Sequence, residues 1–363
     1  MSGKLRTEQN RVAGLKQLMT EHSIDALLIT RRENVRYLTG FTGSAGVVLV
    51  ASGKPRLITD FRYKTQAIRE ATGVSILIQK KDLPAAVREA ADRMKVDTFW
   101  VDESSVTIEG LKKFRKQGLA LKTYRDLVGD LRLRKDHSEL VAINKAIRRA
   151  EEAFRELKQY IRPGARESSL ALMLEVLMRG KGARKAAFDT IVASGRNGAM
   201  PHASVTGRRI KKGDLVTFDF GAEADGYFSD MTRTVCVGRP TNRQREVHGL
   251  VLKAQQAAIA AIRPATECRT VDSVARRIIA GAGHAAHFGH GTGHGVGLMV
   301  HEGPSVSSRS TALVQRGMVF TVEPGIYIPG WGGVRIEDMV LVTENRAKVL
   351  TTLPRSLDGS GNL

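Results

Sequence analysis

Two pairs of acidic residues in the C-terminal half of the chain flank sequences that are typical of β-hairpins. Asp219 and Asp230 lie on either side of the turn sequence Ala224-Asp225-Gly226, and β-prone residues border that turn. A two-residue loop at Ala224-Asp225 would place Asp219 directly opposite Asp230. A loop at Asp225-Gly226 would instead make Asp230 a diagonal neighbour on the same face. Either register brings two carboxylates together.

The second pair of acids is Glu323 and Glu337. Residues 318–323 and 334–337 are strand candidates, and the glycine-rich turn 329–333 joins them. A loop centred on Gly330 would pair Glu323 with Glu337. Each hairpin alone could simply expose its acids to solvent. Because like charges on adjacent strands are destabilising unless a cation compensates, the two pairs together favour a cation site.

A glycine-rich segment between the hairpins adds histidines. Glycine occurs at every second position from Gly289 to Gly297, which disfavours a helix and allows close backbone approach. His290 and His294 are therefore not expected to form a helical zinc pair. Four carboxylates and an imidazole are mainly oxygen donors that suit two divalent ions, with Mn²⁺, Co²⁺, Zn²⁺ and Fe²⁺ all compatible. The five histidines outside any motif are interpreted as structural or surface residues: His22, His137, His248, His284 and His287.

These residues lie in motifs that resemble those of the proline-specific members of metallopeptidase family M24, the pita-bread peptidases aminopeptidase P and prolidase. Residues 34–44 also resemble the accessory domain of that family, so the resemblance covers nearly the whole chain. The matching motifs follow the order and spacing of the family, and they are Met200-Pro201-His202, Asp219-Phe220-Gly221, Ser229-Asp230-Met231-Thr232-Arg233-Thr234, Gly289-His290-Gly291-Thr292-Gly293-His294-Gly295, His301-Glu302-Gly303-Pro304, Val322-Glu323-Pro324-Gly325 and Val334-Arg335-Ile336-Glu337-Asp338.

The resemblance implies an architecture of two domains. An α/β N-terminal creatinase/prolidase-like accessory domain would occupy residues 1–130. An α+β pita-bread catalytic domain with pseudo-twofold symmetry would occupy residues 131–363. The family also implies a homodimer.

A ligand set follows from the same resemblance. One divalent ion would take Asp219, the second would take His294 and Glu323, and Asp230 and Glu337 would bridge the two ions. A water shared by two such ions becomes a hydroxide nucleophile near neutral pH. It would attack the carbonyl of the residue before proline. Mn²⁺ is the favoured ion.

The remaining site residues would act on the proton and the substrate. Glu323 would also accept the proton of the nucleophile, while His202 and His301 would stabilise the oxyanion or support proton transfer. His290 would form a pocket wall for the proline side of the substrate, and Arg335 would orient the bridging carboxylates. Arg309 would bind the terminal carboxylate of the substrate. An exposed loop position is the alternative for Arg309.

The expected function is therefore hydrolysis of the Xaa-Pro bond, either at peptide N-termini or in Xaa-Pro dipeptides. Such a bond has no amide hydrogen and a rigid φ, so ordinary extended pairing with a protease fails and a dedicated pocket is needed. Two alternatives remain open. The first is a metal-free relative, meaning a creatinase-like enzyme or a non-catalytic binding module, and the second is a nucleic-acid-associated protein of the same fold.

The nucleic-acid alternative is motivated by the net charge of +20. Residues 1–135 carry 26 basic and 15 acidic residues and residues 136–363 carry 31 and 22, so the excess is spread along the chain. The densest cluster, residues 208–212, precedes Gly213-Asp214 and is interpreted as an exposed turn. Aromatic residues are not interleaved with basic runs as stacking platforms would be. We interpret the charge as a generally cationic surface and expect no nucleic-acid partner.

Membrane and secretory segments are not expected. No run of about 18 apolar residues occurs, and the first residues lead into no apolar region. Cys236 and Cys268 are too few for a disulfide framework and match no zinc motif. This cysteine usage suits a reducing compartment, so the expected location is the cytoplasm.

The elements that must position the site form two patterns. A helix at residues 4–22 precedes strand candidates at 26–29, 46–50, 56–58, 74–78 and 99–101, with helices at 62–71, 83–94 and 108–117. This alternation predicts an α/β domain with a mixed sheet. The boundary is expected near residues 127–135, and Asp136-His137-Ser138-Glu139 predicts the start of a helix that runs to about residue 160.

An internal repeat organises the second pattern. Ile161-Arg162-Pro163 recurs as Ile262-Arg263-Pro264, 101 residues later. Each copy follows a long helix and precedes a shorter one, at residues 168–179 and 271–280. The shared order predicts a duplication with the site at the junction of two halves. Ala265 replaces the glycine of the first copy, Gly164, a difference expected to affect the turn but not the site.

Overall fold

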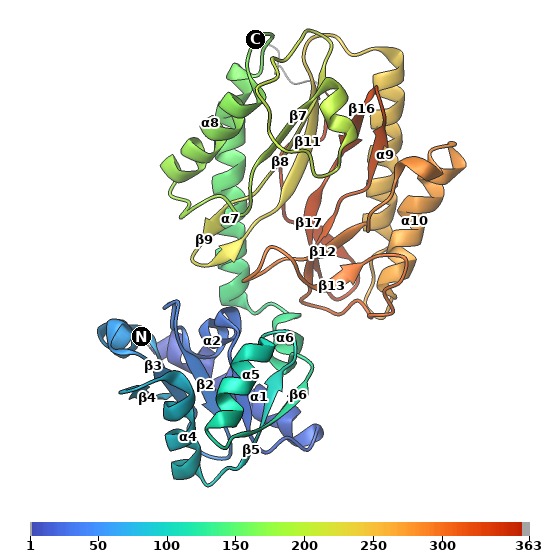
Figure 1. Cartoon of the computed structure of the whole chain (residues 1–363). Coiled ribbons are helices and arrows are strands. Elements are labelled where there is room, and N and C mark those ends of the chain that lie inside the picture. Colours follow the sequence, from blue (N-terminus) through green and yellow to red (C-terminus); the bar gives the residue numbers. More distant parts are fainter. Residues whose placement is uncertain (1, 358–363) are drawn as a thin grey trace. The chain divides into compact units, whose positions relative to one another are not determined.

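A six-stranded mixed sheet organises the first of the two units into which the chain divides, Met1–Arg132 and Leu133–Leu363 (Figure 1). The computed structural model describes residues 2–357. The strands, in their order across the sheet, are β4 (Ser75–Ile78), β3 (Arg56–Thr59), β2 (Val47–Val50), β1 (Leu27–Ile29), β5 (Thr98–Asp102) and β6 (Ala120–Tyr124). The helices are α1 (Ser2–Glu21), α2 (Arg32–Thr39), the 3₁₀ turn η1 (Phe61–Tyr63), α3 (Lys64–Glu70), α4 (Leu83–Met94), α5 (Ile108–Lys116) and α6 (Leu127–Arg132).

The α/β class and the mixed sheet of this unit are confirmed, because β1 pairs antiparallel with β2 and parallel with β5. Helix α4 illustrates why the sequence forms these elements. The Asp82 side chain accepts a hydrogen bond from the Ala85 amide at the start of the helix. Val87 and Ala91 on its apolar face are buried against the sheet residues Leu28 and Phe99. Helix α2 and strand β6 were not expected.

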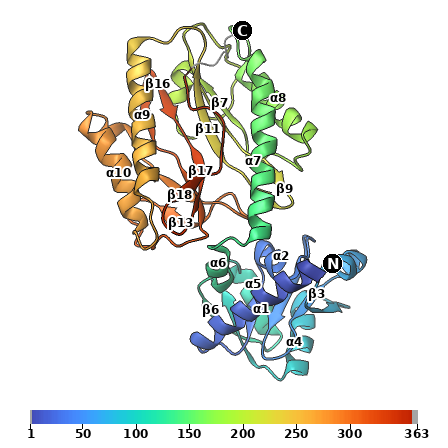
Figure 2. The ribbon, with the colours of Figure 1, turned by 180° about the vertical axis from the view of Figure 1, so that it is seen from behind.

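The second unit places its strands between two pairs of helices, as both views show (Figures 1 and 2). One pair is α7 (His137–Leu157) with α8 (Glu167–Gly180), and the other is α9 (Asn242–Ala261) with α10 (Cys268–Gly281). Three short 3₁₀ segments follow α7, β7 and α10, and they are η2 (Lys158–Tyr160), η3 (Gly195–Ala199) and η4 (Ala285–His287). Helix α7 begins with a capping box, in which Asp136 accepts from the Glu139 amide and Glu139 accepts from the Asp136 amide.

The strands of the second unit form several ladders that meet at the centre. The first half contributes β7 (Ile191–Ser194), β8 (Leu215–Phe220), β9 (Glu223–Ala224), β10 (Tyr227–Phe228) and β11 (Met231–Cys236). The second half contributes β12 (Gly293–Gly295), β13 (Glu302–Val306), β14 (Val319–Val322), β15 (Gly325–Ile328), β16 (Gly332–Arg335), β17 (Asp338–Val342) and β18 (Ala347–Val349). A hydrogen bond of 3.2 Å from the Glu337 amide to the Thr232 carbonyl joins the two halves.

The duplication appears in the backbone contacts of the two Arg-Pro turns. The Gly164 amide donates to the Ile210 carbonyl at 2.8 Å, and the Ala265 amide donates to the Val314 carbonyl at the same distance. Gly164 has a φ of 90° and Ala265 a φ of 67°, so both adopt the left-handed conformation. Ala265 was expected to affect the turn, but the turn has the same conformation in both copies. Hydrogen bonds on either side hold the alanine in the conformation that glycine takes freely.

The first hairpin follows one of the two registers considered from the sequence. Asp219 pairs with Thr232, and Asp225 and Gly226 form the turn with φ values of 51° and 81°. Asp230 is therefore the diagonal neighbour of Asp219, and the directly opposed pairing is wrong. Two residues with positive φ give a turn whose twist matches that of the strands, and glycine favours the register that contains Gly226.

The second hairpin divides into two ladders that share one register. β14 pairs with β17, ending at Val322 opposite Asp338, and β15 pairs with β16, beginning at Gly325 opposite Arg335. Glu323 and Glu337 lie in the gap between these ladders. The expected alignment around Gly330 is confirmed. The expected strand partners are wrong, because residues 318–323 pair beyond residue 337 rather than with residues 334–337.

Two further features of the described residues concern the cysteines and membrane-spanning helices. Cys236 and Cys268 are buried and form no disulfide bond. Between residues 2 and 357, no helix combines the length and the apolar character that crossing a membrane requires.

Candidate active site

A cavity of about 540 Å³ in the second unit collects the residues that the sequence singled out, with one exception. Its walls come from both halves of the duplication, residues 188–230 of the first half and residues 290–337 of the second. Of the residues expected at the site, the lining includes His202, Asp219, Asp230, His290, His294, His301, Glu323, Arg335 and Glu337. Arg309 is exposed and does not line the cavity.

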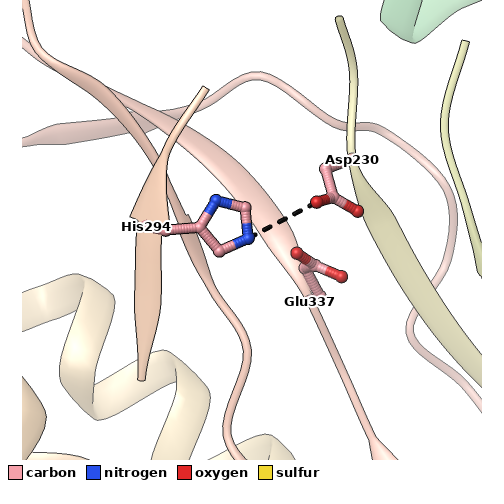
Figure 3. A group of neighbouring side chains, drawn as sticks. All are labelled: Asp230, His294 and Glu337. Atoms are coloured by element: carbon pink, nitrogen blue, oxygen red, sulfur yellow. Dashed lines mark ion pairs between the residues drawn. The ribbon is translucent and has the colours of Figure 1, made fainter. Parts of the chain in front are cut away.

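Three of these side chains point at one position. One ligand atom from each of Asp230, His294 and Glu337 lies within 4.8 Å of the others. Figure 3 shows the three side chains turned toward one another. Nε2 of His294 is 3.5 Å from Oδ2 of Asp230 and 3.4 Å from Oε1 of Glu323. The four residues come from four different segments. Asp230 lies in the loop before β11 and His294 lies in strand β12. Glu323 directly follows β14, and Glu337 lies between β16 and β17. The junction of the ladders therefore gathers the donors.

The ring of His294 presents a lone pair to these carboxylates. Its Nδ1 is 3.2 Å from the carbonyl oxygen of Gly295, which can only accept, so Nδ1 carries the hydrogen. Burial lowers the pKa of His294, which keeps the ring neutral near pH 7. Nε2 then presents its lone pair toward the carboxyl groups of Asp230 and Glu323. A histidine whose other ring nitrogen donates to a backbone carbonyl has the usual orientation of a metal ligand.

The charge of the carboxyl groups in the cavity also favours a bound cation. Burial, followed by the neighbouring acids, raises the pKa of Asp230 and of Glu337 well above the ordinary range of carboxylates. Burial also raises the pKa of Glu323 to about 7. Asp219 is the fourth carboxylate, and its buried Oδ1 has no hydrogen-bond partner. The donor set and this unpaired oxygen fit divalent cations.

Arg335 is the arginine of the site, and it is almost fully buried. Its Nη2 lies 2.7 Å from Oδ2 of Asp219, and its Nε donates to Oγ1 of Thr232 at 3.0 Å. Thr232 in turn donates to Oε2 of Glu337 at 2.7 Å. Arg335 was expected to act on the bridging carboxylates. It instead pairs directly with Asp219 and reaches Glu337 through a threonine, because its side chain extends along β11.

The same arginine orients a second wall of the cavity. Nη1 of Arg335 donates to Oη of Tyr327 at 2.8 Å and to the Pro201 carbonyl at 3.1 Å. Nδ1 of His290 faces the Gly291 carbonyl at 2.8 Å, so its Nε2 accepts from Oη of Tyr327 at 2.9 Å. Burial lowers the pKa of His290 to about 4, so this ring is neutral. His290 is thus fixed as a neutral wall.

His202 and His301 differ from the buried donors because both are exposed at the mouth of the cavity. The ring of His301 lies 4.3 Å from that of His294, centroid to centroid, at an angle of 61°. Burial and the neighbouring His294 lower the pKa of His301. Both imidazoles can therefore meet a substrate entering from solvent.

Three supporting residues were missed by sequence reasoning. They are Thr232, Thr321 and Tyr327. Thr321 donates to Oε1 of Glu323 at 3.2 Å and accepts from the His294 amide at 3.0 Å. Both threonines lie two residues from a site carboxylate, so the two-residue period of a strand could have placed them on the face of the site. No comparable signal marks Tyr327.

A cavity lined by converging acids and neutral histidines, built at the junction of two duplicated halves, defines a metal-dependent enzyme. Residues 141–344 match the model of metallopeptidase family M24, and residues 11–133 match the creatinase/prolidase N-terminal domain. The chain therefore belongs to metallopeptidase family M24, and it is a metallopeptidase with the creatinase-type N-terminal domain and pita-bread catalytic domain of that family.

Individual relatives are similar over almost their whole length. The Xaa-Pro dipeptidase of Pyrococcus horikoshii is 37% identical over 350 residues, which cover 96% of this chain and 98% of the relative. A solved Xaa-Pro dipeptidase from Bacillus anthracis superposes with a TM-score of 0.94 at 38% identity and covers 97% of this chain and 99% of that chain. An X-Pro aminopeptidase from Thermotoga maritima has a TM-score of 0.87 at 38% identity, with 93% and 97% covered.

Proposed function

We propose that this metallopeptidase is a dinuclear exopeptidase that hydrolyses the Xaa-Pro bond, at peptide N-termini or in Xaa-Pro dipeptides. The observation that carries the proposal is the gathering of four carboxylates and His294 in one cavity, where Nε2 of His294 lies 3.5 Å from Asp230 and 3.4 Å from Glu323 and Arg335 pairs with Asp219. Similar proteins are named Xaa-Pro dipeptidase and X-Pro aminopeptidase, which supports proline-containing substrates.

The donors for the two ions would be Asp219, Asp230, His294, Glu323 and Glu337. Two ions are favoured over one because the four acids exceed the charge of Arg335 by three, and one divalent ion would leave one of these negative charges uncompensated. Divalent ions bound there supply Lewis acidity, which lowers the pKa of a water molecule and polarises a carbonyl oxygen. Mn²⁺ remains the favoured ion, with Co²⁺, Zn²⁺ or Fe²⁺ as alternatives.

Glu323 is the residue suited to move the proton. Its pKa of about 7 in the metal-free cavity shows how strongly burial favours its protonated form. Its hydrogen bond from Thr321 holds Oε1 toward His294. A carboxylate in this position accepts a proton from the attacking water and returns it to the imide nitrogen of proline as the bond breaks.

The histidines at the mouth act on the substrate. His202 and His301 can each donate an N–H to the carbonyl oxygen of the residue before proline, where negative charge develops during attack. His290, with Phe188 and Ile191, forms a wall that can accept the proline ring. Because the neutral His290 is held by Tyr327, this wall is preorganised and contributes no competing charge.

Product analysis on Ala-Pro and Ala-Pro-Ala, with metal-free protein loaded in turn with Mn²⁺, Co²⁺ and Zn²⁺, tests the proposal. Release of alanine with two metal equivalents bound is the expected result, and the ratio of the two rates separates dipeptidase from aminopeptidase activity. Absence of both metal binding and turnover after loading would instead assign the chain to the metal-free relatives.

Assembly and location extend the proposal. The family resemblance favours a homodimer, which sedimentation equilibrium of the purified chain tests, and the cysteine usage favours the cytoplasm. Filter binding with RNA at physiological ionic strength tests the nucleic-acid alternative. Release of the RNA at low salt is the expected result, because the excess charge is spread over the sequence.

A further inference from the structure

A second cavity in the catalytic unit has a strongly positive lining. It measures about 720 Å³, and we call it the cationic pocket; its chemically distinctive residues are Arg196, Arg208, Arg209, Lys211, Asp214 and Trp331. None of these residues lines the active-site cavity. Four cationic side chains against one carboxylate leave three positive charges in a concave surface. Such a surface concentrates anions more effectively than the same charges on a convex face.

The acids in and behind this pocket already have partners within the protein. Oδ2 of Asp214 is 2.7 Å from Nη1 of Arg208 and accepts from the Lys211 amide at 2.7 Å. Behind the wall, Glu167 is fully buried and accepts hydrogen bonds from Ser194 and Asn197. Arg208 and Asn197 are therefore structural members of the wall.

The remaining cations have capacity left for a ligand. Within residues 2–357, the side chains of Arg196 and Lys211 are exposed and form no hydrogen bond or ion pair. Arg209 uses Nη1 for the Gly164 carbonyl at 2.9 Å, which leaves further N–H groups of its guanidinium. The indole of Trp331 adds an aromatic surface, and the guanidinium of Arg243 lies 5.1 Å from its centroid.

We propose that the cationic pocket binds a small phosphate-bearing anion. Two arginines and a lysine with unused donors match the oxygens of a phosphate, since arginine binds such oxygens through paired N–H groups and lysine as a point charge. The adjacent indole offers a stacking surface to a base or another flat group carried by the phosphate.

Two segments that line the pocket continue along the chain into residues that line the active-site cavity, which offers a route by which a bound ligand affects catalysis. Segment η3 carries Arg196 and leads directly to Pro201 and His202. Strand β16 begins beside Trp331 and leads to Arg335. The two segments touch through glycines, because a Cβ on Gly333 would lie 2.0 Å from the Gly198 carbonyl oxygen. A ligand that draws Arg196 toward Trp331 therefore shifts the backbone that holds both His202 and Arg335.

Fluorescence of Trp331 offers a direct binding measurement. Trp100 is the other tryptophan of the chain, and the Trp100→Phe variant leaves Trp331 as the reporter. The metal-loaded protein is titrated with inorganic phosphate, adenosine 5′-monophosphate and adenosine, with chloride at matched ionic strength. Saturable signals are expected for the first two only. Tighter binding of the nucleotide than of phosphate indicates stacking, and equal affinities indicate that the phosphate alone is recognised.

Paired variants assign the signal to this pocket. Arg196→Gln/Lys211→Gln removes two unused cations without touching the Arg208–Asp214 pair. Arg179→Gln/Lys253→Gln removes the same charge from exposed positions on α8 and α9. The first pair is expected to raise the Kd by about tenfold or more and the second to leave it unchanged. Equal affinities in both variants, or no saturable binding to the wild type by fluorescence and by equilibrium dialysis, would overturn the proposal.

The kinetic measurement rests on the proposed peptidase function, whereas the measurement of anion binding does not. Saturating phosphate is expected to change kcat or KM for Ala-Pro in the wild type and in Arg179→Gln/Lys253→Gln. The change should be absent from Arg196→Gln/Lys211→Gln at the same concentration. A change of equal size in all three proteins would place the effect at the active site and overturn the coupling. Absence of turnover with binding intact would count against the peptidase function alone.

Discussion

Arg335 and Asp219 form an ion pair of 2.7 Å inside a cavity that is lined by four further carboxylates, those of Asp189, Asp230, Glu323 and Glu337. The pair joins the two halves of the duplication, since Asp219 lies in β8 and Arg335 ends β16. It leaves one oxygen of Asp219 without a partner. The arginine therefore limits the repulsion among the acids without removing their capacity to bind cations.

Replacement of Arg335 by lysine tests this balance. Lysine keeps the charge but cannot donate simultaneously to Asp219, Thr232 and Tyr327, because it lacks the planar fork of arginine. Turnover of Ala-Pro is expected to fall by at least about 100-fold, since two or more charge-assisted hydrogen bonds are lost. Steady-state kinetics with a Tm measurement on each protein provide the check. Activity within a few-fold of wild type would show that charge alone suffices.

The bridging carboxylates can be replaced by their amides. Asp230→Asn and Glu337→Gln are expected to abolish turnover while the fold is retained. Because each substitution also removes a charge that burial disfavours, the metal-free protein should melt no lower than wild type. Asp225→Asn, at the exposed tip of the same hairpin as Asp230, is the matched control and should remain active. Near-wild-type activity in either amide variant would contradict the bridging role.

Metal removal should make stability fall as pH rises. The folded pKa of Glu323, about 7, exceeds the value of about 4.3 for an unfolded glutamate, so the folded metal-free state binds the extra proton. Its stabilising contribution is complete below the unfolded pKa and is lost as pH rises toward 7. The Tm of chelated protein should therefore decline from pH 5 to pH 8, less steeply in Glu323→Gln. The increase in Tm on adding Mn²⁺ should be larger at pH 8.

Thr232 is expected to act as a positioning residue. Thr232→Val keeps the shape but removes the hydroxyl that links Arg335 to Glu337. We expect kcat to fall on the order of 10- to 100-fold, the loss of one hydrogen bond to a charged group. Thr232→Ser retains the hydroxyl and should recover most of the activity. A serine variant as impaired as the valine variant would indicate a packing effect instead.

Arg309 is the one expected site residue that lies outside the cavity lining, so its role stays a prediction. If it grips the terminal carboxylate of a dipeptide, Arg309→Gln should raise the KM for Ala-Pro about tenfold. The KM for Ala-Pro-Ala, whose carboxylate lies one residue further on, should change less. Comparison of the two KM values in the same preparation is the measurement. Equal, small changes would assign Arg309 to the exposed loop.

Short-range patterns predicted much of this architecture. The turn sequence around Gly226 predicted the first hairpin in either of two registers, and the structure has the one with Gly226 in the turn. Asp136 with Glu139 marked the start of the long helix α7. The gap between the two ladders around Glu323 could not be read from the sequence, because it depends on β17 pairing with β14 across the sheet. Helix α2 was missed because its eight residues include few apolar positions in a helical pattern.

The site was predictable where chemistry required rare residue types and unpredictable where it required common ones. Acids and histidines between glycines stand out in a sequence. Thr232 and Tyr327 do not, although they hold Arg335 and His290 in place. The cationic pocket also escaped sequence reasoning. Its residues Arg208, Arg209 and Lys211 belong to a segment that was interpreted as an exposed turn, and only the fold brings Arg196 and Trp331 beside them.

Because the proposed metal-binding residues are divided between the duplicated halves, a cut in the chain between the halves separates them. Asp219 and Asp230 precede the exposed connection at Gly238 and Arg239, while His294, Glu323 and Glu337 follow it. A chain severed at that connection yields two polypeptides, each inert because neither carries a full set of donors. Their reassociation would restore hydrolysis, which makes the enzyme a candidate reporter for the meeting of two fused proteins.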